Sequence, residues 1–521
     1  MINTNILRGR RKMKIKIQCD SFHIIICLII IFDRQWCCRS ESFFGKIRRL
    51  ATGGGLDEEE EIKERDDGGI PPLLHGDGLN HVPSAKLSNG IAIPLIGLGA
   101  GSIEPELVSA IISQGLKDDK NIRLIDTSII SHNEFLVAKG IVDGVEWLIA
   151  NRKNNNRRVE TSSSSSSRIE VHVVSKVWYT HLGYNRTLLA VKSSLESLQE
   201  ATNHPNVDLK IHMMLHWPRC YDTIPWMDCL GEENNVSEEM KNAGPSPHLN
   251  KEDAWKESWT ALEGLVVDNS NPIASIGVSN FHLKELEELS RIAKVTPHIV
   301  ETNTWSLLYD PLLIEFCHKR GIHLIAYHLM EGVIRKADSA PFAYHHLLSI
   351  ANDVTNKMRS TGLLSSSEGS SDNTDSEQVS PAQVVLSWLV QHSISVIPRT
   401  TDLNHLNENS ASSISKIPTL GDTQVQIVAH SVEALISGED LTEDAFVKLT
   451  FHAKTKDIYL YWHDPEFGGE IEVAKIEKGT SFEESSHPGH VFRIYDSPEN
   501  TDAMELFTVS GNYGEHRHIE L

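Results

Sequence analysis

Residues 122–134 read Ile-Arg-Leu-Ile-Asp-Thr-Ser-Ile-Ile-Ser-His-Asn-Glu, a short apolar run that ends in an acidic residue. Isoleucine and leucine side chains lead up to Asp126, which predicts a buried β-strand, Ile122–Asp126, ending in a carboxylate. After the turn, a helix is expected to begin near Asn133. For an isolated aspartate, the simpler interpretation is that its carboxylate only caps the turn. The pattern in the rest of the chain favours a functional carboxylate.

From Leu87 onward, short β-branched runs alternate with amphipathic helical stretches. The expected strands are Ala92–Gly97, Ile122–Asp126, Val171–Val177, Ile211–His216, Ile273–Val278, His298–Thr302, His323–Tyr327 and Ser395–Pro398. The helical patterns between them include Thr187–Gln199, Ala254–Val267, Leu283–Ile292, Pro311–Arg320 and Pro381–Gln391. This alternation predicts an α/β fold, a parallel (β/α)8 TIM barrel over residues 85–425. An open doubly wound sheet is the alternative, but no Gly-x-Gly-x-x-Gly motif follows the first strand.

Polar side chains stand at the carboxyl ends of seven successive expected strands. They are Asp126, Lys176, His216, Ser279 with Asn280, Glu301, Tyr327, and Arg399 with Thr400. Each has a structural interpretation of its own: Lys176 could extend its ammonium to solvent, and His216 could be a hydrogen-bonded core histidine. Barrel enzymes build their active sites on this face, so seven such positions together predict an active site.

Charge is distributed unevenly along the 521 residues, whose formal net charge is -22. Residues 1–50 hold 11 Lys and Arg against 3 Asp and Glu, a net charge of +8, which leaves -30 for the remainder. An acidic body argues against nucleic acid as a partner. Seven cysteines are present without a Cys-x-x-Cys pair, so cysteine usage indicates little about the compartment.

The first 50 residues combine a basic region with an 11-residue apolar run, Phe22–Phe32. This pattern is typical of a signal peptide or a short signal anchor, although about 20 residues are needed to span a bilayer. We expect an uncleaved membrane anchor with a lumenal body. The alternatives are a cleaved targeting peptide or a misplaced start, and the protein is cytoplasmic if the segment is not used. Residues 51–84 are predicted to form an acidic, disordered linker.

Three low-complexity segments interrupt the barrel pattern: Asn151–Ser167, Arg219–Leu249 and Ser360–Gln378. All three are predicted to be flexible surface loops. Arg219–Leu249 follows the fourth expected strand, where a barrel's active-site loops lie, so it is expected either to border the substrate pocket or to be disordered.

The order and spacing of several motifs resemble the aldo-keto reductase family from about Lys86 to Asn409. The matching segments are Leu87–Gly90, Pro94, Gly97–Gly99, Asp126–Ser128 with Asn133–Glu134, Val174–Trp178, Leu215–Pro218, Ser275–Phe281, Ala326–Tyr327, Ile397–Thr400 and Glu408–Asn409. The resemblance implies a NADPH-dependent reductase of aldehydes or ketones.

In the family, a tyrosine with a pKa lowered by a neighbouring lysine protonates the carbonyl oxygen. The resemblance implies that Lys176 is that lysine, that Asp126 is its carboxylate partner, and that His216 holds the carbonyl. The tyrosine position is occupied by Ser131, which is shorter and far less acidic than a phenol. Tyr179 and Tyr184 follow Lys176 and are weaker candidates to supply a hydroxyl. No metal site is expected.

Cofactor positions also carry over by resemblance. Ser279 and Asn280 match the pair that binds the nicotinamide carboxamide, Tyr327 matches the stacking aromatic residue, and Glu301 stands where the family usually has glutamine. For the adenosine end, Arg399 with Thr400 match the residues that grip the 2′-phosphate. Glu408 with Asn409 match adenine contacts, and His405 replaces a second contact that is usually arginine.

A second domain is expected over residues 440–521. The runs Val447–Phe451, Ile458–Trp462, Glu470–Ile476, His490–Tyr495 and Glu505–Val509 predict a small β-sandwich. Residues Ile458–Trp462, Gly468–Gly469, Lys478–Thr480 and His487–Phe492 resemble the β domain of the von Hippel-Lindau tumour suppressor. That resemblance implies a hydroxyproline contact by Ser486 and His490, whereas a plain interaction module is the simpler interpretation.

The sequence therefore supports two alternative functions. The first is a NADPH-dependent oxidoreductase acting on a small-molecule carbonyl, impaired because Ser131 replaces the catalytic tyrosine. The second is a catalytically lapsed scaffold that binds NADP(H) and acts on a protein partner through its C-terminal β domain. Either protein could be tethered to a membrane through its N-terminus.

Overall fold

The computed structural model describes residues 82–154, 168–268, 271–303, 311–328, 339–364, 378–438, 440–441, 447–463, 470–486, 491–498, 504–509 and 516–521. Its largest feature is a sheet of eight parallel strands in the order β10-β9-β8-β7-β6-β5-β4-β3. These strands are β3 Gly97–Gly99, β4 Leu124–Asp126, β5 Ile169–Val177, β6 Val207–Leu215, β7 Ile273–Ser279, β8 Ile299–Asn303, β9 His323–Tyr327 and β10 Ser395–Val396. The predicted parallel barrel is confirmed.

The two edges of this sheet meet and nearly close the barrel. Ile96 forms a parallel bridge with Val396, and the Gly99 amide donates to the Pro398 carbonyl at 3.2 Å. The prediction of one strand over Ala92–Gly97 is wrong. Residues Ala92–Pro94 form β2, which pairs antiparallel with β1, Ser84–Lys86, and the barrel's first strand begins only at Gly97.

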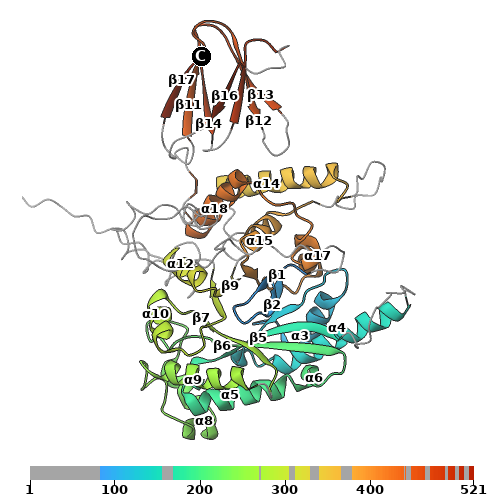
Figure 1. Ribbon diagram of the computed structural model, residues 1–521, viewed down its shortest axis with the longest axis vertical. Coiled ribbons are helices and arrows are strands. Elements are labelled where there is room, and N and C mark those ends of the chain that lie inside the picture. The colour runs from blue at the N-terminus through green and yellow to red at the C-terminus, as the bar shows by residue number, and fades with distance from the viewer. Residues whose placement is uncertain are drawn as a thin grey trace, which may run out of the picture.

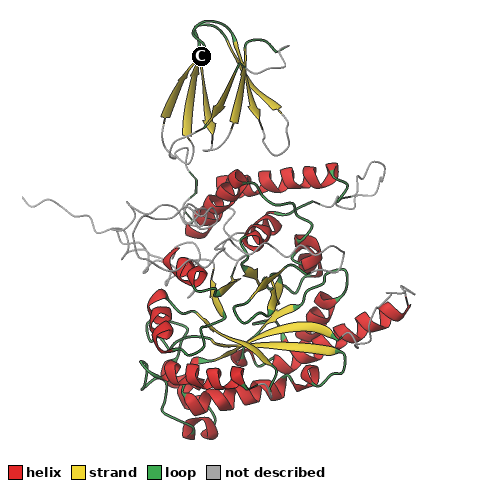
Figure 2. Ribbon diagram, in the orientation of Figure 1, coloured by secondary structure: helices red, strands yellow, loops and turns green. Residues whose placement is uncertain are grey.

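Helices cover the outside of the barrel, as Figures 1 and 2 show for α5, α9 and α10. Their bounds are α3 Pro105–Leu116, α4 Glu134–Asn154, α5 Tyr184–Ser197, α6 Gln199–Thr202, α7 Cys229–Asn235, α8 Glu238–Asn242, α9 Ala254–Val267, α10 Leu283–Ile292, α12 Pro311–Lys319, α14 Pro341–Ser360, α15 Pro381–Gln391, α16 Leu403–Glu408, α17 Ala411–Ile414 and α18 Asp422–Ser437, with 3-10 turns η1 Ile129–Ser131 and η2 Tyr179–His181. The predicted start at Pro381 is confirmed, with Ser380 and Gln383 forming a capping box. The apolar faces of these helices pack on the barrel strands and form one large core.

The barrel interior is layered because alternate residues of a strand face the same side. Its middle layer is apolar and is closed by residues of the β1–β2 hairpin; the cluster comprises Leu87, Ile93, Leu124, Val174, Met214, Ile299, Ile325 and Ile397. Two positions earlier on the strands lies a histidine layer, in which His172 hydrogen-bonds His212 at 2.9 Å and His323 hydrogen-bonds Ser395 at 2.7 Å. Two positions later, the strands end in the polar residues of the predicted site.

The buried histidine layer should make the fold sensitive to acid. Burial lowers the pKa of His323 to about 4, from 6.5 in the unfolded chain. The unfolded chain therefore binds a proton that the folded state excludes, and stability is lost as the pH falls from 6.5 through 4, by about 3 kcal/mol. Urea unfolding followed at several pH values should show this loss. His323→Asn should have a shallower pH dependence, and equal slopes would contradict the assignment.

The C-terminal region forms two small, mainly antiparallel sheets that share a hydrophobic core separate from that of the barrel. The strand order is β14-β11-β17 in one sheet and β13-β12-β15-β16 in the other. Their bounds are β11 Val447–His452, β12 Ile458–His463, β13 Glu470–Ile476, β14 Ser481–Ser486, β15 Val491–Tyr495, β16 Glu505–Thr508 and β17 His516–Glu520. The small β fold is confirmed, with β14 and β17 as strands that the sequence pattern missed. The von Hippel-Lindau resemblance stays a prediction, since Ser486 is described and buried but His490 lies outside the described residues.

Several predictions fall on residues outside the described ranges. They are the basic N-terminus with its apolar run, the linker over residues 51–84 apart from its last residues, and most of the segments Asn151–Ser167 and Ser360–Gln378. Among the described residues, no helix is both long and apolar enough to cross a membrane.

Candidate functional site

Three charged side chains meet at the carboxyl ends of the barrel strands. The Lys176 ammonium on β5 donates to the Asp126 carboxylate on β4 and to the Thr127 carbonyl, the latter at 3.1 Å. Its Nζ also lies 3.1 Å from Oε1 of Glu301 on β8. The side chains of Lys176 and Glu301 are each only 4% exposed. Barrel closure thus places one cation between two carboxyl groups from strands that are far apart in the sequence.

Burial and mutual charge set the protonation of this group. Burial raises the pKa of Asp126, although Lys176 opposes the shift. Burial, followed by the Asp126 charge, raises the pKa of Glu301 to about 8. Burial would lower the pKa of Lys176, but the two carboxylates outweigh it and raise that pKa. At neutral pH the group therefore holds a charged lysine, one carboxylate and one protonated carboxyl, which Glu301 carries.

Asn280 connects the other polar residues of this face. Its backbone is left-handed, with φ of 58°, and its side-chain amide donates to the His216 carbonyl at 2.9 Å and to Ser279 Oγ at 3.2 Å. The Tyr327 hydroxyl donates to Asn280 Oδ1. Burial and then Lys176 lower the pKa of His216 well below its ordinary value, so its imidazole is neutral. His216 Nδ1 has no hydrogen-bond partner among the described residues.

Ser131 lies in the turn that follows β4. Its hydroxyl shares a 2.8 Å hydrogen bond with Ser128 Oγ. The turn is held by Asn133, which accepts from Thr127 Oγ1 at 2.6 Å and donates to the Ala100 carbonyl at 2.9 Å. The chain therefore keeps the turn geometry at this position while carrying a side chain without an acidic group. The hydrogen bonds of the described residues do not join Ser131 to Lys176.

Neither of the two tyrosines proposed as substitutes for the missing phenol joins this charged group. Tyr179 is buried, packs on Trp178 with ring centroids 4.4 Å apart, and has its pKa raised by burial and Glu232. Tyr184 is 44% exposed at the start of α5. The raised pKa makes Tyr179 a weaker acid than an ordinary phenol, and Tyr184 lies largely in solvent.

The positions matched to the adenosine end follow β10. Arg399 is exposed and donates to the Gly101 carbonyl at 3.2 Å, while Thr400 is buried. Helix α16 comes next and ends at Glu408, with Asn409 as its C-cap. The Glu408 backbone carbonyl accepts from Gln383 at 3.0 Å. Arg399 thus presents a cation to solvent beside the barrel mouth.

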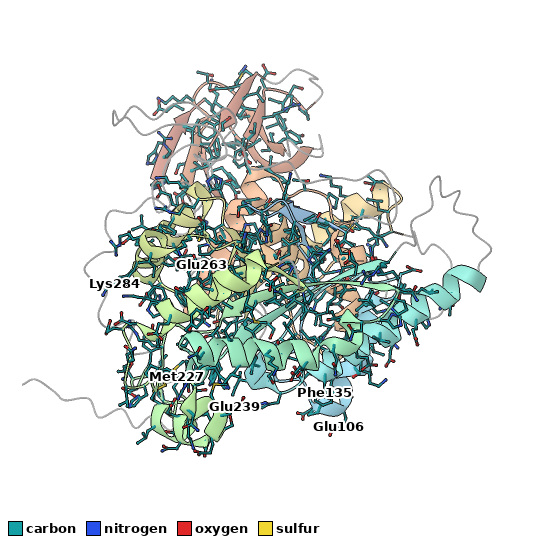
Figure 3. The ribbon with its side chains drawn as sticks, turned by 60° about the horizontal axis from the view of Figure 1, so that its bottom comes forward. Glu106, Phe135, Met227, Glu239, Glu263 and Lys284 are labelled. Atoms are coloured by element: carbon teal, nitrogen blue, oxygen red, sulfur yellow. A yellow bond between two sulfur atoms is a disulfide. The ribbon has the colours of Figure 1, made fainter. Side chains whose placement is uncertain are left out.

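The segment Arg219–Leu249 is folded, so its prediction as a flexible loop is wrong. It contains α7, α8 and a Cys220–Cys229 disulfide, and its residues Met227 and Glu239 are labelled in Figure 3. Trp178 Nε1 donates to Glu232 at 2.6 Å. The Trp226 ring lies 6.4 Å from that of Trp178, which in turn lies 4.9 Å from the His216 ring. The segment therefore packs on Trp178, whose ring contacts His216, and two cysteines nine residues apart were the sequence signal for its order.

One group of metal-capable side chains lies in the same segment. Ligand atoms of Asp222, Cys229 and His248 lie within 4.8 Å of one another. The sulfur of Cys229 is bonded to Cys220, however, and offers no thiolate in this state.

The disulfide should contribute measurably to the stability of this segment. Closing a loop of this size is expected to stabilise the folded state by about 2–3 kcal/mol. Replacing both cysteines, as Cys220→Ser with Cys229→Ser, should therefore speed tryptic cleavage at Lys241 in α8. A thiol reductant should have the same effect on the wild-type chain and no further effect on the double variant. A reductant effect that persists in the double variant would contradict this role.

Comparison with known proteins gives a consistent family. The model of the aldo/keto reductase family matches residues 95–432. The oxidoreductase YtbE of Bacillus subtilis is 28% identical over 330 residues, covering 63% of this chain and 86% of that protein. Glyoxal reductase of the same bacterium is 27% identical over 333 residues, with 63% and 86% covered. The NAD(P)H-dependent D-xylose reductase of Scheffersomyces stipitis is 27% identical over 329 residues, with 63% and 88% covered.

Proposed function

This chain belongs to the aldo/keto reductase family of oxidoreductases, and from that premise we propose that it reduces an aldehyde or ketone with NADPH. The observation that carries the proposal is the buried Lys176–Asp126 ion pair beside the neutral imidazole of His216. The names of two relatives, a glyoxal reductase and a D-xylose reductase that uses NAD(P)H, support a small carbonyl substrate and a nicotinamide cofactor.

The residues at the barrel mouth fit such a cofactor. Ser279 and Asn280 would hold the nicotinamide carboxamide, and Tyr327, fixed by its hydrogen bond to Asn280, would stack on the ring. The exposed Arg399 would bind the 2′-phosphate, for which a planar guanidinium is well suited. Thr400 follows Arg399 directly, and Glu408 and Asn409 lie at the end of α16, where they would contact the adenine. The cofactor, when bound, supplies the hydride.

The chain's own residues would orient and polarise the carbonyl group. The neutral His216 is suited to donate one hydrogen bond from a ring N–H to the substrate oxygen. Lys176 stays charged and supplies a positive field against the oxygen's developing negative charge. Ser131 cannot act as an efficient acid, so water would have to deliver the proton. This arrangement predicts slow turnover.

A nucleotide titration tests the cofactor assignment. Arg399→Met should weaken NADPH binding about 10- to 100-fold, because a charge-assisted hydrogen bond to phosphate is lost. NADH lacks the 2′-phosphate, so its dissociation constant should hardly change and serves as the matched control. Binding is followed by fluorescence in the full chain, and turnover is then measured at the NADPH absorbance with a carbonyl panel. Failure of the wild-type chain to bind either nucleotide would overturn the proposal.

A second function is favoured by one specific observation, the serine at position 131. Its hydroxyl is engaged with Ser128 and is far less acidic than a phenol. We infer as the alternative a catalytically lapsed scaffold that binds NADP(H). Cofactor binding without turnover is its expected signature.

Two proposals concern regions outside the barrel. The β domain has its own hydrophobic core and two sheets, which supports a separate role as a module that binds a protein partner. The basic and apolar sequence of residues 1–50 supports a membrane tether or entry into the secretory pathway. Cell fractionation of the full chain against a chain beginning at residue 51 tests the second proposal.

A further inference from the structure

Glu301 introduces an extra carboxyl group into the most buried part of the candidate site. Its side chain is 4% exposed, Oε1 lies 3.1 Å from Lys176 Nζ, and Ser279 Oγ donates to the same oxygen at 3.4 Å. No N–H or O–H of a described residue donates to Oε2. Family resemblance predicts a glutamine here, so this carboxyl group is a property of this chain.

The groups that face Glu301 leave it one negative charge in excess. Asp126 on β4 and Lys176 on β5 neutralise each other in charge, and His216 at the end of β6 is neutral. Ser279 and Asn280 from β7 carry no charge, and Tyr327 on β9 keeps its proton because burial and Glu301 raise its pKa. An ionised Glu301 would therefore have no cation of its own. Burial, and then the charge of Asp126, raise its pKa to about 8.

The two redox forms of a nicotinamide dinucleotide differ by one charge at the ring that Ser279 and Asn280 would hold. The oxidised ring is positive, whereas the reduced ring is neutral. In a buried site with low dielectric, a cation close to a carboxyl group favours the ionised carboxylate. The neutral ring offers no such compensation.

We propose that Glu301 couples binding of the oxidised cofactor to release of its proton, so that the protein discriminates NADP+ from NADPH by charge. The protonated protein and NADP+ give the carboxylate complex and one free proton, whereas NADPH binds with Glu301 still protonated. This inference rests on the proposed function, because it requires the nicotinamide ring to lie beside Ser279 and Asn280.

Proton linkage sets the direction of the pH dependence. A proton released on binding tightens binding as the pH rises, with a slope of about one decade per pH unit below the pKa of the free group. Because that pKa is about 8, NADP+ affinity should rise up to 100-fold between pH 6 and 8 and level off above pH 8. The 2′-phosphate of the nucleotide also titrates near pH 6. Because both NADP+ and NADPH carry it, its effect cancels in the ratio of their two affinities.

Calorimetric titration of the full chain with NADP+ and with NADPH tests the proposal. At pH 7, runs in two buffers of different ionisation enthalpy should show nearly one more proton released for NADP+ than for NADPH. Glu301→Gln should abolish that difference and flatten the affinity ratio. Glu134→Gln is the matched control, since Glu134 is also a buried carboxyl with a raised pKa, bonded instead to Ser175 and Ser194, and its variant should retain the proton release.

The outcomes separate this inference from the proposed function. If neither nucleotide binds the wild-type chain, the cofactor assignment itself fails. If both bind with the same number of released protons, or if Glu301→Gln keeps the difference, the cofactor assignment stands and the role of Glu301 is overturned.

Discussion

Ser131→Tyr should raise the rate of carbonyl reduction by about 10²- to 10⁴-fold, the usual contribution of a positioned general acid. A phenol has an ordinary pKa of about 10, and the charged Lys176 would bring it closer to working pH. The turn that carries residue 131 is already held by Asn133. Ser131 is only partly buried, and it faces Gly101, where even an added Cβ would stay 3.7 Å from its hydroxyl.

Ser131→Phe is the matched control, because it adds the same ring without the hydroxyl. If the hydroxyl is the missing acid, the phenylalanine variant should be no faster than the wild type. Equal gains in both variants would show that the ring acts by packing. No gain in the tyrosine variant, with NADPH binding intact, would favour the scaffold function.

The same turn shows how far the sequence predicts the site. The motif Asp126-Thr-Ser followed by Asn133 predicts a strand, a turn and a helix start, and all three are present because they depend on local hydrogen bonds. The contact between Lys176 and Glu301 is different. It joins β5 to β8, which are not neighbours in the sheet, and only barrel closure brings them to 3.1 Å. The residue pattern within one strand carries no information about a distance between two strands that are not neighbours.

The wrong predictions also have physical causes. Residues 92–97 form a single apolar run, but antiparallel pairing with Ser84–Lys86 takes the first half into a hairpin. The polar composition of Arg219–Leu249 predicts a flexible loop, whereas a disulfide and a tryptophan hydrogen bond order it. Ser481–Ser486 is mostly polar, so its sequence does not predict β14. The strand forms because it pairs with β11 through backbone hydrogen bonds.

The largest stability effect is expected from Lys176→Met. Removing the ammonium leaves Asp126 and Glu301 without their shared cation in a buried site, which should destabilise the fold by about 3–5 kcal/mol near pH 8. Urea unfolding measures this loss. Lys139→Met is the matched control, since Lys139 forms an exposed ion pair with Asp143, and its removal should destabilise the fold far less.

The pH dependence and a compensating variant identify the cause of that loss. Lys176 lowers the pKa of both carboxyl groups, so without it these pKa values rise further above their unfolded values, and the folded variant takes up more protons than the folded wild type as the pH falls. The deficit of Lys176→Met should therefore shrink from pH 8 to pH 5. Adding Asp126→Asn and Glu301→Gln removes both charges and should recover most of the stability at pH 8. A deficit that stays constant with pH and survives in the triple variant would show that lost packing, not uncompensated charge, is the reason, and the electrostatic account of this site would have to be abandoned.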